Sequence, residues 1–138
     1  MSHFTYGRVD GEADCTVGFY LTHAFSMMAF IAALEPLRIA NRLSGQHLYS
    51  WRIVSQDGLP VTPTNGSMQV PADYSLDNSP DFKVLFVAGP FDPLPYKNVQ
   101  LFKWLNRLGR RDVIIGGIDT GSHILARSGL LRGKRCTI

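Results

Sequence analysis

Apolar positions along the chain fall into short continuous runs separated by stretches with helical spacing. Residues 15–21 and 82–88 are almost entirely apolar, which is typical of strands buried on both faces of a parallel sheet. Residues 49–55 alternate and predict a further strand. Apolar residues recur every three or four positions over 27–42 and 98–109, which predicts two helices. Strands that alternate with helices in this way indicate an α/β three-layer sandwich around a mostly parallel sheet.

The remaining segments complete this picture. Ser26 is placed to cap the first helix, and Pro36 should bend that helix just after Glu35. Residues 61–80 contain several turn signals and predict a loop with a possible short strand at 67–70. Residues 1–13 predict a disordered arm. Residues 135–138 resemble the start of another strand, so we expect one domain over 14–138 that is incomplete at its C-terminus.

Residues 112–126 contain the most informative pattern in the chain. A β-branched run is followed by a glycine pair, then by Asp119, and an amphipathic helix begins just past Gly121. A strand, sharp turn and helix in this order present one side chain at the carboxyl edge of a parallel sheet. Enzymes place a nucleophile there, and here the residue is an aspartate.

The loops at 22–26, 89–97 and 117–122 should converge at that edge, because all three follow strands. In one interpretation Asp119 faces a ligand, with the backbone N–H groups of Gly89, Thr120 and Gly121 as donors. In the other, Asp119 only caps the following helix. The two roles can coexist.

Other candidate catalytic groups have simpler explanations. His123 lies four residues after Asp119, but a lone histidine there is more often a partly buried structural side chain. Hydroxyls at a helix start, such as those of Thr120 and Ser122, usually bond the local backbone. Glu35 could act as a general base, but an ion pair with Arg38 or Arg42 is the favoured reading. The histidines lack metal-ligand spacing, so neither a metal site nor a cofactor is expected.

Phe25 and Phe91 occupy two of the converging loops. Both are most simply core residues. If they instead flank the same pocket as Asp119, two ring faces and a carboxylate would suit a ligand that carries a cationic ammonium group.

Composition narrows the alternatives further. The 138 residues are 45% hydrophobic, enough for one core. The net charge of +3 comes partly from arginine and lysine clusters at helix ends, and no nucleic-acid recognition motif accompanies them. No membrane span or secretory signal is apparent, which predicts a cytoplasmic protein. Cys15 and Cys136 have no metal or disulfide spacing and are expected to be buried free thiols.

Several segments resemble the N-terminal part of GlxA-type AraC-family transcriptional regulators: residues 24–30, 34–45, 49–51, 55–58, 65–66, 117–121 and 125–137. The sensor domain of these regulators resembles the fold of class I glutamine amidotransferases and PfpI-type proteases, a flavodoxin-like arrangement. Enzymes of that superfamily carry a cysteine at the elbow, in G-x-C-x-G, and an acidic residue near the start of the first helix. The matching positions here are Asp119 and Ala29, so the resemblance implies that catalysis is lost and that a pocket is retained for sensing.

The Glu-Pro-Leu-Arg and Asp-Thr-Gly variants are most similar to regulators of choline, betaine or carnitine breakdown, which agrees with an ammonium ligand. The resemblance also implies a homodimer whose DNA contacts come from C-terminal helix-turn-helix motifs absent from this chain. We therefore expect a non-catalytic, ligand-sensing and dimerising domain that binds a small polar metabolite through Asp119, Thr120, Gly89, Phe25, Phe91 and His123. The alternative is a hydrolase or amidase of the same fold that uses Asp119.

Overall fold

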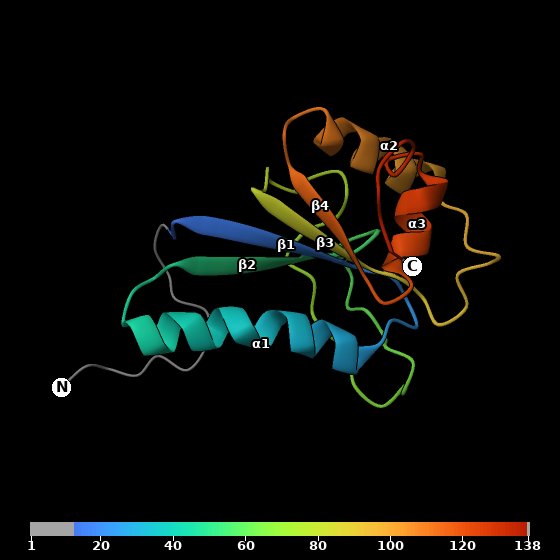
Figure 1. The fold of residues 1–138 in the computed structure, drawn as a ribbon. Coiled ribbons are helices and arrows are strands. Elements are labelled where there is room, and N and C mark those ends of the chain that lie inside the picture. The colour runs from blue at the N-terminus through green and yellow to red at the C-terminus, as the bar shows by residue number, and fades with distance from the viewer. Residues whose placement is uncertain (1–12, 138) are drawn as a thin grey trace.

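The fold is a single parallel sheet with helices on both faces (Figure 1). A computed structural model describes residues 13–137. Its elements in chain order are β1 (Cys15–Leu21), α1 (Met27–Ser44), β2 (Tyr49–Val54), β3 (Val84–Ala88), α2 (Val99–Gly109), β4 (Ile114–Ile118) and α3 (Gly121–Arg127). Within residues 13–137, no helix is both long enough and apolar enough to cross a membrane.

The four strands lie in the order β2-β1-β3-β4, and every neighbouring pair is parallel. Helix α1 covers one face of the sheet, and α2 and α3 lie over the other (Figure 1). The predicted three-layer α/β architecture is therefore confirmed. The order reverses between β1 and β3, and such a switch point opens a crevice at the carboxyl ends of those two strands.

Two hydrophobic cores explain why the central strands are continuously apolar. Leu85 and Val87 of β3 pack with α2 and α3 on one face of the sheet. Phe86 and Ala88 pack on the other face with Phe30 of α1. Because alternate side chains of such a strand enter two different cores, neither of its faces is exposed to solvent and both are apolar.

Helix boundaries follow the capping chemistry of the sequence. The hydroxyl of Ser26 accepts a hydrogen bond from the backbone N–H of Ala29, as predicted for the start of α1. Gly45 ends α1 in the left-handed conformation, at φ 66°. Asn98 caps α2 by accepting a bond from the N–H of Leu101 at 2.9 Å.

Helix α1 continues through Pro36 and ends at Ser44, close to the expected end near residue 42. Other local expectations are wrong. The segment 67–70 forms no strand but only an isolated antiparallel bridge between Val61 and Val70. Residues 135–137 form no strand. Cys15 is half-buried and Cys136 is exposed, so the expectation of two buried thiols fails for Cys136. The arm predicted over 1–13 lies outside the described residues except for Ala13.

Candidate functional site at the carboxyl edge of the sheet

Three loops meet at the carboxyl ends of β1, β3 and β4, as predicted. Thr22, just after β1, donates from its backbone N–H to the carbonyl of Ala88 at 3.2 Å and from its hydroxyl to the same oxygen at 3.1 Å. The N–H of Phe91 donates to the carbonyl of Ala24 at 2.8 Å. The hydroxyl of Thr120 donates to the carbonyl of Pro90 at 2.6 Å. The loop after β3 is thus bonded to both of the other loops.

Asp119 lies at the apex of the turn between β4 and α3. Its φ is 53°, in the left-handed region, and its side chain is exposed. Few residues other than glycine adopt this conformation, although aspartate tolerates it better than most. Such strain is retained where the surrounding structure fixes it, and it is concentrated at functional sites.

Asp119 is not the cap of α3, so that interpretation is wrong. The N-cap is Thr120, and no side-chain hydrogen bond caps the helix. The Thr120 hydroxyl is used instead on Pro90. The carboxylate of Asp119 is therefore not committed to the helix and stays available at the surface.

The tight turn depends on two glycines. A Cβ at Gly121 would overlap the carbonyl oxygen of Val87, because α3 begins directly against the backbone of β3. A Cβ at Gly89 would overlap the hydroxyl and backbone of Thr120. The absence of these two side chains lets the loop after β3 lie against the start of α3.

His123 does not form a relay with Asp119. No hydrogen bond or ion pair joins the two residues in the part of the chain that the structure describes. The Nε2 atom of His123 is buried without a hydrogen-bond partner. A buried unpaired nitrogen is uncommon in folded proteins, so this atom calls for an explanation.

The two candidate aromatic residues lie in different environments. Phe25 is fully buried and packs edge-on against Phe30, with ring centroids 5.8 Å apart. Phe91 is 76% exposed. The two rings therefore do not flank one accessible space. The core interpretation holds for Phe25 and fails for Phe91.

Glu35 forms the predicted ion pair with Arg38. The guanidinium binds the carboxylate through two nitrogens, at 2.9 Å and 2.6 Å. The hydrogen bond from Arg38 lowers the pKa of Glu35, which disfavours a role as a base. Ala29, where the resemblance implies that an acid has been lost, has no ionisable group.

Two features of the site escaped the sequence reasoning. Ala24 also adopts the left-handed conformation, at φ 59°, and its carbonyl accepts bonds from Phe91 and from the hydroxyl of Thr64. The second feature is a polar cluster behind the same edge. Gln56 accepts from the hydroxyl of Tyr20 at 3.2 Å and from the amide of Asn98 at 2.7 Å. Burial, with a smaller contribution from Tyr96, raises the pKa of Tyr20.

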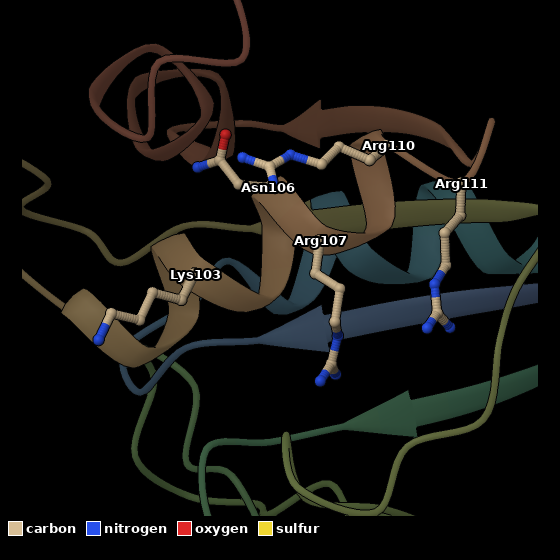
Figure 2. A pocket seen from close by; sticks show the side chains of 5 residues that line it. All are labelled: Lys103, Asn106, Arg107, Arg110 and Arg111. Carbon is tan, nitrogen blue, oxygen red and sulfur yellow. The ribbon is translucent and has the colours of Figure 1, made fainter.

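A separate basic depression of about 380 Å³ lies on the outer surface of α2, away from Asp119. It is lined by Lys103, Asn106, Arg107, Arg110 and Arg111. Figure 2 shows Arg107 and Arg111 projecting to one side of the helix and Asn106 and Arg110 to the other. Arg111 pairs with Asp81 at 2.9 Å. Side chains that diverge from a convex helix do not surround a ligand, so this surface fits the interpretation of solvated charges.

Comparison with known proteins agrees with the resemblance in the sequence. The regulator CdhR of Pseudomonas aeruginosa is 46% identical over 120 residues, which cover 87% of this chain and 35% of CdhR. The regulator GbdR of Pseudomonas aeruginosa is 36% identical over 126 residues, covering 89% of this chain and 33% of GbdR. Both are described as HTH-type transcriptional regulators. The chain thus spans about a third of the length of these relatives.

A solved structure gives the same result at the level of the fold. The crystal structure of an AraC-family transcriptional regulator from Pseudomonas putida superposes with a TM-score of 0.78 at 29% identity. The match covers 88% of this chain and 65% of that one. The chain is therefore related to the N-terminal domains of AraC-type regulators. Residues 16–138 match the DJ-1/PfpI family throughout, and the chain belongs to that family.

Proposed function

We propose that this chain is the non-catalytic sensor domain of an AraC-family transcriptional regulator and that it binds a small polar metabolite at Asp119. The observation that carries the proposal is the exposed carboxylate of Asp119, held at φ 53° at the meeting point of three loops. A strained, uncommitted charge at the carboxyl edge of a parallel sheet, in the turn next to the loop after β3, is a feature expected of a binding site.

The missing chemistry favours sensing over catalysis. A carboxylate at the elbow is a poor nucleophile for acyl transfer compared with a thiolate. Ala29 cannot donate or accept a proton, and Glu35 is bound to Arg38. The curated relatives are regulators, which supports the same conclusion.

The ligand class follows from charge and aromatic surface. A carboxylate attracts a cation, and the exposed ring of Phe91 in the neighbouring loop can contact an ammonium group through its face. Phe25 supports the loop from the core. Thr120 and Gly89 lie in contact and hold the two loops together, and the Nε2 atom of His123 has no hydrogen-bond partner of its own and is the further polar group proposed for the ligand. A quaternary ammonium or amino-acid-like metabolite satisfies these conditions.

Isothermal titration with choline, betaine, carnitine and cationic amino acids tests the proposal. We expect at least one compound to bind, and Asp119→Asn to weaken it at least tenfold, which is about 1.4 kcal/mol. Asp112→Asn is the matched control, because Asp112 is also exposed and has φ 56° but precedes β4 at the opposite end of the strand. Equal loss in both variants, or no heat with any compound, would contradict the proposal.

The alternative, a hydrolase or amidase that uses Asp119, is tested with the same variants. Turnover of amide or ester substrates by the wild type that disappears in Asp119→Asn would establish the enzyme. Activity that is absent from both proteins agrees with the sensor.

A further inference from the structure

Positive and negative charges are separated along the chain. Residues 97–138 contain nine of the fourteen lysines and arginines but only two of the eleven acidic residues. Residues 1–96 contain the other five basic and nine acidic residues, so the two parts have net charges of opposite sign. A surface that serves only solubility mixes both signs, and a charge asymmetry of this kind is typical of a chain that meets a large anion.

The positive charges gather on two neighbouring segments. Three exposed cations lie on the outer side of α2, and three more follow in the segment after α3. That segment curls back beside α2 (Figure 1), where the amide of Asn106 donates to the carbonyl of Ser128 at 2.9 Å and the side chain of Leu130 lies over Gly109. The six cations, here called the basic surface, are Lys103, Arg107, Arg110, Arg132, Lys134 and Arg135.

The helix dipole explains only part of the basic surface. It favours cations in the last turn of a helix, which accounts for Arg107 and Arg110 at the end of α2. Lys103 lies one turn earlier, and Arg132 follows the end of α3 by five residues. Like charges four positions apart, such as those of Lys103 and Arg107, destabilise a helix. The arrangement therefore does not serve the stability of the fold.

The charges of the basic surface are not neutralised from within. Arg111, beside this surface, pairs with Asp81 at 2.9 Å. Among residues 13–137, by contrast, none of the six cations of the basic surface forms an ion pair or donates a hydrogen bond from its side chain. Figure 2 shows Arg107 and Arg110 projecting to opposite sides of α2. An anion that meets both side chains must therefore extend across the helix.

We propose that the basic surface contacts the phosphate backbone of duplex DNA. This contact rests on the regulator function proposed above and goes beyond it, since the resemblance implies DNA contacts only in motifs that are absent from this chain. Contacts to phosphates position a protein on the duplex without reading its sequence, so they need no recognition motif.

Shape and composition favour a duplex over other anions. Diverging side chains on a convex helix do not enclose a metabolite, but they can lie along an extended polyanion. A protein partner would need apolar or aromatic anchors, and no large hydrophobic side chain is exposed between residues 103 and 111. DNA carries one charge per roughly 1.7 Å of its axis, whereas an extended acidic polypeptide carries at most one per roughly 3.3 Å. The denser charge favours DNA.

The number of cations sets the expected strength. Each neutralised phosphate contributes about 0.9 to the slope of log K against log salt concentration. Contact by three to six cations therefore predicts a slope between about −2.7 and −5.4. We expect a dissociation constant of roughly 10⁻⁴ to 10⁻⁶ M at physiological salt, typical of binding that is independent of sequence.

Fluorescence anisotropy of a labelled duplex of arbitrary sequence, titrated with the 138-residue chain at several salt concentrations, tests the proposal. We expect the double variant Arg107→Gln/Arg110→Gln to raise the dissociation constant at least tenfold and to reduce the magnitude of the slope by about 2. Arg107→Lys keeps the charge and should bind like the wild type. The matched control is Arg42→Gln/Arg52→Gln, which removes the same charge from α1 and β2 and should weaken binding by less than about threefold.

Three outcomes overturn the proposal. They are the absence of binding by the wild type at low salt, an equal loss in both double variants, and binding of polyglutamate as tight as that of DNA at the same salt. The last result would assign the basic surface to an acidic protein. Circular dichroism checks that each variant is folded.

The DNA contact and the ligand site are tested separately. Arg107→Gln/Arg110→Gln should still bind an ammonium compound at Asp119, because the basic surface lies away from that residue. Asp119→Asn should not weaken DNA binding, because it removes a negative charge. A variant pair that lost both activities together would contradict the assignment of two separate surfaces.

Discussion

Replacing Gly121 with alanine tests whether the elbow requires direct contact between α3 and β3. The added Cβ overlaps the carbonyl oxygen and carbon of Val87, which belong to the backbone of a strand held between β1 and β4. No side-chain rotation relieves this overlap, so the start of α3 must move away from the sheet.

Two effects of opposite sign decide the magnitude. Alanine is favoured over glycine within a helix by up to about 1 kcal/mol. Overpacking costs about 1–3 kcal/mol where flexible side chains can adjust, and a contact between backbone atoms lies at or above the upper end of that range. The net expectation is a loss of about 2 kcal/mol or more in the free energy of unfolding, which for a chain of this length lowers Tm by roughly 6–10 °C.

The measurement is urea denaturation, followed by circular dichroism, of Gly121→Ala beside Ser122→Ala. Ser122 is the next residue of the same helix, and its hydroxyl makes only an exposed bond of 3.3 Å to the carbonyl of Asp119. We expect the control to change stability by less than about 0.5 kcal/mol. A Gly121→Ala protein as stable as the wild type would show that α3 does not begin against Val87 and would refute the geometry of the elbow.

Three further substitutions test individual contacts. Thr120→Val removes the 2.6 Å bond to Pro90 and should cost about 1–2 kcal/mol in urea denaturation, with Thr120→Ser close to the wild type. Glu35→Gln removes the ion pair with Arg38. Because the pKa of Glu35 is lowered, the pair stabilises the fold at pH values above the usual pKa of 4.5 and stops doing so as the pH falls below it. The Tm difference between the variant and the wild type should therefore vanish in acid, and a difference that persists there would count against the pair. Tyr20→Phe removes the bond to Gln56 and should cost about 1 kcal/mol near neutral pH. The raised pKa keeps Tyr20 protonated in the native state, whereas tyrosine in the unfolded chain ionises above pH 10. The stability advantage of the wild type should therefore shrink as the pH rises beyond 10, which a series of Tm measurements checks.

The sequence was most informative where one local pattern determined the structure. β1 begins and ends where its apolar run does, because the strand enters two cores and its neighbours Asp14 and Thr22 are polar. The elbow could be anticipated from the glycine pair before Asp119. Strand β4 starts only at Ile114, since Asp112 adopts φ 56° and cannot extend the ladder.

The parts that could not be predicted depend on distant partners. The N-cap of α3 is Thr120 and not Asp119, and the Thr120 hydroxyl donates to the carbonyl of Pro90, thirty residues earlier, instead of capping the helix. The ring of Phe25 turns into the core because Ala24 and Phe25 are bonded to Thr64, a residue in a loop without regular structure. The hydrophobic periodicity of the sequence around these residues does not reveal contacts with residues far away in the chain.

The proposed ligand site and helix α1 are connected through one short segment. Residues 22–26 lie between β1 and α1, and Ser26 caps that helix. In the same segment Ala24 has a φ of 59° and accepts a bond from the N–H of Phe91, a residue of the loop proposed to contact the ligand. We therefore expect a ligand that displaces Phe91 to affect the backbone of Ala24, and through it the first turn of α1.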